Sequence, residues 1–156
     1  LSGVYEFRLL NFDKARERFE KYRDSAKDKI DRARGALAVG TCFENESFID
    51  GDESLLENAK EAYQQAIDLG GSSYVRYQAM IAQARLLGRD KATRDEAIEM
   101  LEKVISRRQE LVEQATPGKK DEAELTDREK ELQRFDAPGL AGEAEDLVKT
   151  LKSLGK

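Results

Sequence analysis

The sequence predicts an all-α protein, and three observations support this fold class. Apolar side chains recur at intervals of three and four residues along most of the chain, which is the period of an amphipathic helix. Capping residues and glycines separate these stretches, and no alternating run bounded by hairpin turns is found. Charged residues make up 38% of the chain and hydrophobic residues 39%, a balance that favours exposed amphipathic helices over a buried parallel sheet.

Composition also narrows the function. The chain has 156 residues, enough for one domain with its own core. Its formal net charge is −5, and a protein that binds duplex nucleic acid usually carries a basic excess, so nucleic acid is not an expected partner. Cys42 is the single cysteine and there is no histidine. We therefore predict no catalytic residue, no metal site and no cofactor.

No apolar run approaches the roughly 18 to 20 residues that a membrane-spanning helix needs. The chain begins with Leu1 rather than methionine, which suggests a fragment of a longer protein, a processed form or a chain shortened for expression. An anchor upstream would change the compartment. The sequence leaves open a cytoplasmic, a bacterial periplasmic and a membrane-tethered location.

The first helices are expected from Ser2 to about Asp24. An apolar opening over Ser2–Leu10 resembles the second half of a helix, and Asn11 is a suitable N-cap for the next one. That second helix carries an apolar stripe at offsets 0, +3, +7 and +10, formed by Phe12, Ala15, Phe19 and Tyr22.

A third helix follows the pair Ser25 and Asp28, which resembles a capping box. We expect it to end at about Phe43. The stretch from Glu44 to Asp52 is rich in turn-forming residues and predicts a loop.

The strongest helix signal is Ser54–Leu69. Ser54 and Glu57 form a complete capping box, and Gly70-Gly71 ends the helix in a left-handed conformation. One stripe is apolar, consisting of Leu56, Ala59, Tyr63, Ala66 and Ile67.

Two further helices are predicted after Ser73. The first spans Tyr74–Leu87 and stops at Gly88. The second begins with a capping box at Thr93 and Glu96 and runs to Ala115, where Thr116-Pro117-Gly118 terminates it. Its inward positions are Ala97, Leu101, Val104 and Ile105.

The C-terminal part predicts helices over 119–135, with a capping box at Thr126, and over 140–154. The stretch Asp136-Ala137-Pro138-Gly139 separates them. The basic pairs Arg107-Arg108 and Lys119-Lys120 are expected on a solvated surface.

An internal repeat links these helices. Ala15, Ala59 and Ala97 lie 44 and then 38 residues apart, and each precedes a large apolar residue by four positions: Phe19, Tyr63 and Leu101. This pattern resembles the tetratricopeptide repeat family. The third unit matches best, with the family's first-helix spacing and turn glycine at Tyr77, Met80, Ile81, Ala84 and Gly88.

The resemblance implies a right-handed α-α superhelix of about three tetratricopeptide-like helix pairs, capped by the C-terminal helices. The chain would then be one domain, 1–156, with repeats at about 1–24, 26–69 and 73–115. Both spacings exceed the family's 34 residues, and an unrelated helical bundle is the alternative. The residues expected to pack the repeats together are Ala15, Phe19, Ala59, Tyr63, Ala66, Tyr77, Ala97 and Leu101.

In the resembled family, the first helices of the repeats line a concave groove that binds peptides or helices. By position, this groove would present Asp31, Arg34, Ala38, Thr41, Val75, Gln78, Ala82 and Arg85. Arg34 and Arg85 would bind carboxylates of the partner. Ordinary solvated helix residues are the alternative interpretation.

The resemblance therefore implies a noncatalytic scaffold or adaptor for a protein or peptide. The alternative is a structural protein that self-associates through its first helix and the long helix over 93–115, so a homo-oligomer is one expected state. Assembly in the bacterial envelope is one setting that the family allows.

Overall fold

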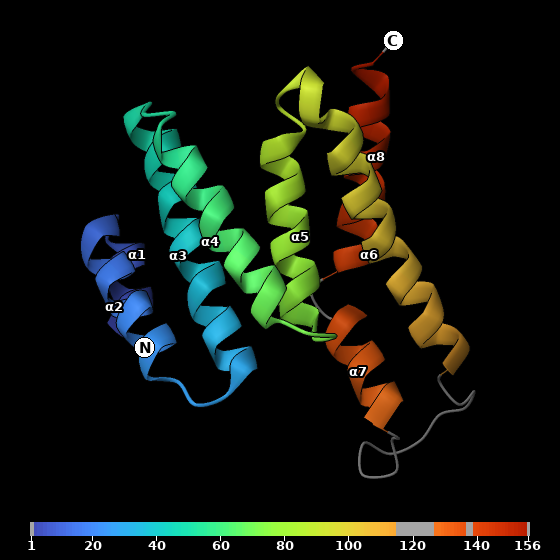
Figure 1. Cartoon of the computed structure of the whole chain (residues 1–156), viewed down its shortest axis with the longest axis horizontal. Helices are drawn as coiled ribbons and strands as arrows, with labels where there is room; N and C mark the ends of the chain where they lie inside the picture. The colour runs from blue at the N-terminus through green and yellow to red at the C-terminus, as the bar shows by residue number, and fades with distance from the viewer. Residues whose placement is uncertain (1, 115–126, 137–138, 156) are drawn as a thin grey trace. The chain divides into compact units, whose positions relative to one another are not determined.

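The computed structural model describes residues 2–114, 127–136 and 139–155. Within these ranges the chain forms α-helices, one short 3-10 helix and no strand (Figure 1). The all-α prediction is confirmed. The elements are α1 Ser2–Arg8, α2 Phe12–Ser25, α3 Lys29–Asp50, α4 Leu55–Leu69, α5 Tyr74–Leu87, η1 Lys91–Thr93, α6 Arg94–Gln114, α7 Asp127–Asp136 and α8 Leu140–Ser153.

The helices form two compact units, Leu1–Leu86 and Leu87–Lys156. The boundary falls inside the stretch 73–115, which the sequence predicts to be one repeat. In the first unit, α1 packs on α2, α2 on α3 and α3 on α4. Figure 1 shows α2, α3 and α4 side by side in alternating directions. One buried cluster joins α3, α4 and α5 through Ala59, Tyr63, Ala82 and Leu86, with Leu37, Phe43 and Leu56 around it.

Helix α3 is longer than predicted, because it continues to Asp50 through the stretch that was expected to be a loop. Tertiary contacts explain the difference. Glu44 accepts a hydrogen bond from Tyr63 of α4, Glu46 pairs with Arg16 of α2, and Ser47 is buried. Only at Gly51, with φ +72°, does the backbone become left-handed and end the helix.

Several predicted capping residues are also wrong. Asp28 caps α3 by accepting from the backbone N–H groups of Ile30 and Asp31, and Ser25 takes no part in that cap. Ser54 is itself helical and makes no side-chain cap. The Asp52 carboxylate accepts from the backbone N–H and the hydroxyl of Ser54 at 3.0 and 2.6 Å. A nearby acceptor therefore replaced the serine that the sequence pattern favoured.

The helix ends show the same kind of difference. Gly70 is right-handed, and the left-handed glycine is Gly71 with φ +57°. The Thr93 hydroxyl donates to the Leu87 carbonyl at 2.6 Å, and the Asp90 carboxylate accepts from Ala92 in η1. The Asn11 side chain makes no cap hydrogen bond at the start of α2. The sequence located these ends to within a few residues but assigned the wrong capping groups.

In the second unit, α6 packs against both α7 and α8. Its buried apolar side chains include Leu101, Val104, Leu111, Phe135, Leu140, Ala144 and Leu151. The pair Arg107-Arg108 is not simply solvated, contrary to prediction. Arg107 donates to Glu131 at 2.8 Å, and Arg108 donates to both carboxylate oxygens of Asp136 at 2.9 and 3.2 Å.

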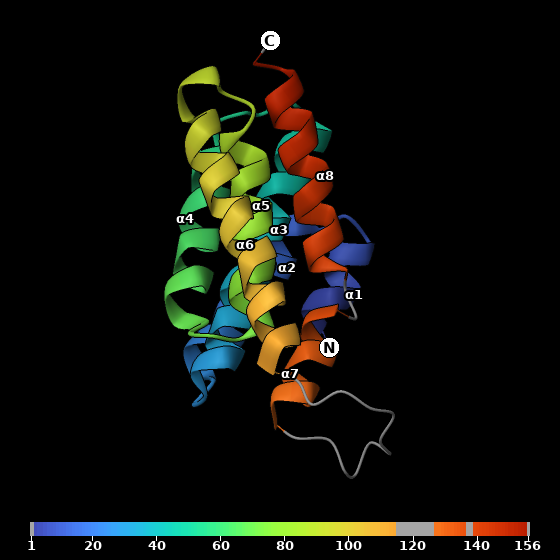
Figure 2. The same ribbon diagram turned by 90° about the vertical axis from the view of Figure 1, so that its right-hand side faces the viewer.

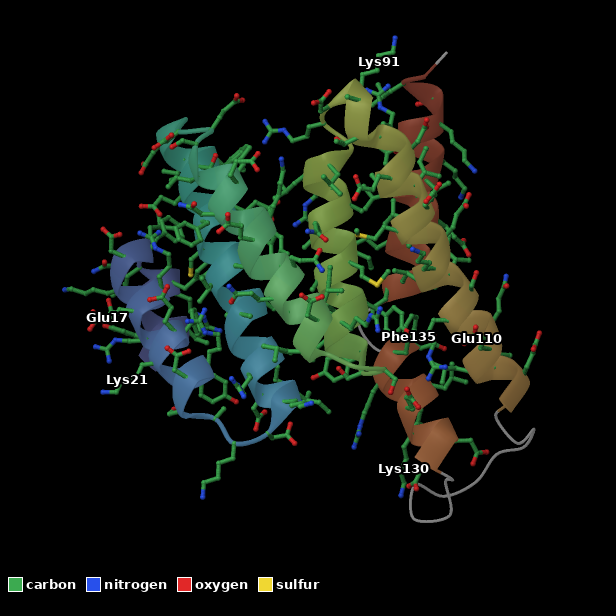
Figure 3. The ribbon with its side chains drawn as sticks, viewed as in Figure 1. Glu17, Lys21, Lys91, Glu110, Lys130 and Phe135 are labelled. Carbon is green, nitrogen blue, oxygen red and sulfur yellow. The ribbon has the colours of Figure 1, made fainter. Side chains whose placement is uncertain are left out.

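Several sequence predictions fall outside the described residues: Ala115, the terminator Thr116-Pro117-Gly118, the pair Lys119-Lys120, the cap Thr126 and part of the break at 136–139. Of the helix predicted over 119–135, the described part is α7. Exposed charged side chains such as Glu17, Lys21 and Glu110 point away from the helices that carry them (Figure 3).

Candidate functional site

Helices α3 and α4 of the first unit approach each other closely. Tyr63 of α4 is fully buried, and its ring lies against the backbone of α3 at Gly40. A Cβ atom added at Gly40 would lie 2.5 Å from Cε1 of Tyr63, so only glycine leaves room for the ring. Two small residues therefore make room for the Tyr63 ring. They are Gly40 on the neighbouring helix and Ala59 one turn earlier on α4.

The Tyr63 hydroxyl ends in a buried polar contact. It donates to Oε2 of Glu44 at 2.5 Å. Burial, and then the charge of Glu44, raise the pKa of the Tyr63 phenol, so it stays protonated and remains a donor. The same carboxylate accepts from Nε and Nη2 of Arg85 on α5 at 2.9 and 3.0 Å. Glu44 thus links three helices.

This contact changes the interpretation of Arg85. The sequence predicts that Arg85 binds a carboxylate of a partner, but the carboxylate of Glu44 in the chain itself accepts from Nε and Nη2 along one edge of its guanidinium. Arg85 therefore serves the packing of α5 on α3 in this structure.

Arg34 makes a second link between α3 and α5. Its Nη2 donates to the Tyr74 hydroxyl at 3.1 Å, and its guanidinium lies 5.8 Å from the centroid of the Tyr74 ring. Its Nη1 donates to Asp31 at 2.6 Å. The hydrogen bond to Tyr74 and that to Asp31 raise the pKa of Arg34. These contacts hold a permanent positive charge in one orientation while half of the side chain stays exposed.

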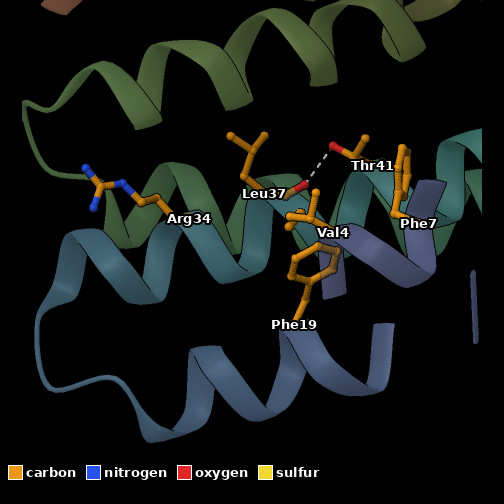
Figure 4. Close-up of a pocket in the computed structure, with 7 residues that line it drawn as sticks. Val4, Phe7, Phe19, Arg34, Leu37 and Thr41 are labelled. Atoms are coloured by element: carbon orange, nitrogen blue, oxygen red, sulfur yellow. Dashed lines mark hydrogen bonds between the residues drawn. The ribbon is translucent and has the colours of Figure 1, made fainter. Parts of the chain in front are cut away.

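Helices α1, α2 and α3 leave an apolar pocket of about 310 Å³ between them (Figure 4). Its lining residues are Val4, Phe7, Phe19, Arg34, Leu37, Ala38 and Thr41. Figure 4 shows Arg34 at one end and Phe7 at the other, with Phe19 rising from α2. The Thr41 hydroxyl donates to the Leu37 carbonyl at 2.9 Å, so it offers little polarity to the pocket.

The rings at the pocket are fixed by their neighbours. Phe7 meets Phe12 edge to face, with centroids 5.5 Å apart. Phe19 lies against Gly3 of α1, where an added Cβ would be 2.7 Å from its ring. Phe19 nevertheless stays only half-buried, because its other side faces the pocket. The pocket is thus formed by packed helices and not by a loop.

Three of the predicted groove residues, Arg34, Ala38 and Thr41, lie together in this pocket, and Asp31 adjoins it through Arg34. The predicted residues of α5 lie elsewhere. Val75 and Ala82 are buried and Gln78 is half-buried. Of the residues expected to pack the repeats, Ala15, Ala59, Tyr63, Ala66, Ala97 and Leu101 are fully buried, while Phe19 and Tyr77 are half-buried.

Sequence reasoning missed most of the apolar lining. Val4 and Phe7 belong to an opening without clear periodicity, and Leu37 both lines the pocket and packs against the buried cluster around Tyr63. Phe48, which was placed in a loop, lies in the last turn of α3 with 88% of its surface exposed. The signal that was available is the spacing from Leu37 through Thr41 to Phe48, offsets of four and seven residues that share one helix face.

The lining of the pocket determines what it could bind. Its lining combines an apolar surface with one positively charged group, which suits a bulky apolar side chain next to an acidic one. Burial raises the pKa of the Cys42 thiol to about 12, so that thiol is neutral and unreactive near neutral pH. Among the residues that the structure describes, no three His, Cys, Asp or Glu side chains form a cluster able to hold a metal ion.

In the described part of the chain, no helix combines the length and the apolar character needed to cross a membrane. Comparisons of the chain with protein-family models, with curated proteins and with solved structures gave no match.

Proposed function

We propose that this protein is a noncatalytic interaction module, a scaffold or adaptor built from tetratricopeptide-like helix pairs in a right-handed superhelix. It binds a protein partner by accepting an apolar side chain in the pocket between α1, α2 and α3. The observation that carries the proposal is the pocket itself, which is apolar, about 310 Å³ in volume and bordered at one end by Arg34.

The two glycine–aromatic contacts support the repeat interpretation. Gly3 with Phe19 joins α1 to α2, and Gly40 with Tyr63 joins α3 to α4. In each pair the first helix contributes the glycine and the second helix the ring. An equivalent contact that recurs in consecutive helix pairs is what a repeat protein requires, because each unit buries the face of its neighbour in the same way.

The pocket size supports a side chain as the ligand. Sites for whole small molecules occupy roughly 300 to 1,000 Å³. This pocket lies at the lower end of that range and is partly open to solvent, which suits one or two side chains of a docked segment. Arg34, held by Asp31 and Tyr74, would orient that segment through an acidic residue.

A peptide-display selection tests the proposal. A random peptide library is selected on the wild-type protein, and the recovered peptides are measured on Ala38→Trp, which fills the pocket. Glu61→Trp, an exposed position on α4, is the matched control. We expect peptides rich in Leu, Phe or Trp that bind wild type and Glu61→Trp equally and bind Ala38→Trp at least about tenfold more weakly.

Circular dichroism and thermal melting must agree among the three proteins, so that lost binding is not lost folding. Recovery of no peptides would contradict the proposal. So would peptides that bind wild type and Ala38→Trp with the same affinity.

A further inference from the structure

One face of α3 carries both the pocket and an exposed aromatic side chain. Phe48 follows Thr41 by seven residues and Leu37 by eleven, which places all three on one side of the helix. Phe48 is 88% exposed, and its neighbour Ile49 is 52% exposed. Removing an exposed aromatic ring from water is favourable, so contact of Phe48 with a partner would stabilise a complex.

The turn that carries Phe48 is accessible. Figures 1 and 2 both show the α3–α4 turn extending past the ends of α1 and α2 within the first unit. Phe48, in the last turn of α3, therefore lies close to this tip of the unit, whereas the α3 residues of the pocket come earlier on the same helix.

The charges at the two ends of this face are opposite. Arg34 lies at one end of the pocket. Asp50 and Asp52, both exposed, follow Phe48 within four residues. The tip thus has the chemistry that the pocket suits, a bulky apolar side chain with acidic residues close behind it.

We propose that the occupant of the pocket is a second copy of this chain. The two copies place their α3 helices antiparallel across a two-fold axis, and Phe48 of each copy enters the pocket of the other. This inference rests on the proposed function in one respect, because it requires that the pocket accept an apolar side chain from a protein.

The register follows from the sequence. With the axis at the level of Phe43, residues equally distant from it in opposite directions face each other. Phe48, five residues after the axis, faces Ala38, five residues before it. At 1.5 Å per residue each lies about 7.5 Å from the axis. The same register sets Arg34, nine residues before, against Asp52, nine residues after.

One arrangement therefore covers both exposed features at once. It buries two Phe48 rings, fills two pockets and forms two contacts between Arg34 and Asp52. Because the same patch is used on both copies, the assembly closes as a dimer and does not extend into a filament. A partner that used only the pocket would leave Phe48 in solvent.

Sedimentation velocity over a range of protein concentrations tests this dimer. We expect a concentration-dependent dimer for wild type. Phe48→Ala and Ala38→Trp should each raise its dissociation constant at least about tenfold, because each removes both symmetry-related contacts. Leu154→Ala, at another exposed apolar residue, is the matched control and should leave the constant unchanged.

Mixing the two variants gives a sharper test. The Phe48→Ala copy keeps its pocket, and the Ala38→Trp copy keeps its Phe48. A mixture of the two should therefore form a heterodimer tighter than either variant forms alone. Arg34→Asp should also weaken the dimer, and Arg34→Asp combined with Asp52→Arg should recover part of the loss.

A monomer at all concentrations up to about 1 mM overturns the inference, and so does a dimer that Phe48→Ala and Ala38→Trp leave unchanged. The peptide selection separates this failure from failure of the proposed function. If the protein stays monomeric while selected peptides bind wild type and not Ala38→Trp, the pocket is a binding site and only its occupant was wrong.

Discussion

The two glycine–aromatic contacts of the first unit pair a glycine on the first helix with a ring on the second, yet only one of the two rings is fully enclosed. In α3 and α4, the ring of Tyr63 lies on Gly40 and is fully buried. In α1 and α2, the ring of Phe19 lies on Gly3 and remains half-buried at the edge of a pocket. The comparison separates a contact that holds helices together from one that leaves room for a ligand.

The difference comes from what surrounds each ring. α3 has 22 residues, and the cluster around Tyr63 includes Ala82 and Leu86 of α5. α1 has seven residues, and its side chains Val4 and Phe7 line the pocket beside Phe19 without filling it. The same local pattern therefore gives a closed core where the neighbouring helices are long and a pocket where the first helix is short.

The largest expected effect is the loss of the enclosed ring. Tyr63→Ala should reduce the free energy of unfolding by about 3 to 5 kcal/mol, because it leaves a cavity that the surrounding packed side chains cannot fill. Phe19→Ala should cost less than half as much, since that ring already borders an open pocket. Urea unfolding of both variants measures the two values. Equal losses would show that the two contacts are equally enclosed.

Alanine substitutions of the two glycines should follow the same order, with the larger loss of stability at Gly40 and the smaller at Gly3. Gly40→Ala should destabilise by about 1 to 3 kcal/mol, because the added methyl group overlaps a ring that has no free space. Gly3→Ala should be close to neutral, since Phe19 can turn toward the pocket and alanine favours a helix over glycine by about 1 kcal/mol. Thermal melting compares them. Adding Tyr63→Leu to Gly40→Ala should restore part of the loss, and no restoration would contradict the contact.

At about pH 9 the smallest expected effect concerns Cys42, which packs with Phe12 and Ala15 where α2 meets α3. Its folded pKa is raised to about 12 by burial, against about 8.5 for an exposed thiol. The unfolded chain therefore loses this proton first as pH rises. Stability from Cys42 is complete below about pH 8.5 and falls between there and pH 12, by up to about 1.4 kcal/mol per pH unit.

Urea unfolding of wild type and Cys42→Ala at pH 8, 9 and 10 measures this dependence. The difference in stability between the two proteins should shrink as the pH rises. A constant difference would mean that solvent reaches the thiol, and that the α2–α3 contact is as open as the pocket next to it.

Most of the helices were predictable, because they carry their own apolar stripes. The stripe around Ala59 and Tyr63 set the position of α4 to within one residue. The end of α3 was not predictable, since residues 44–50 are helical through contacts with α2 and α4. A stretch with turn-forming composition stayed helical because its side chains found partners on other helices.

Part of the candidate site was also predictable from the sequence, and part depended on tertiary contacts. Arg34, Ala38 and Thr41 could be placed on one helix face by their spacing. Arg85 was expected on the same surface but is bound to Glu44, a residue 41 positions away. The spacing of residues in the sequence does not predict the pairing of Arg85 with Glu44, because that pairing depends on how two helices pack together.

The sequence alone determined that this protein is helical, where most of its helices lie, and that small residues precede large ones at matching positions. These properties depend on neighbours within one or two turns. The tertiary structure decided which ring is enclosed, which arginine borders the pocket, and that Phe48 is exposed in the last turn of α3. Those outcomes depend on the lengths and contacts of helices far apart in the chain.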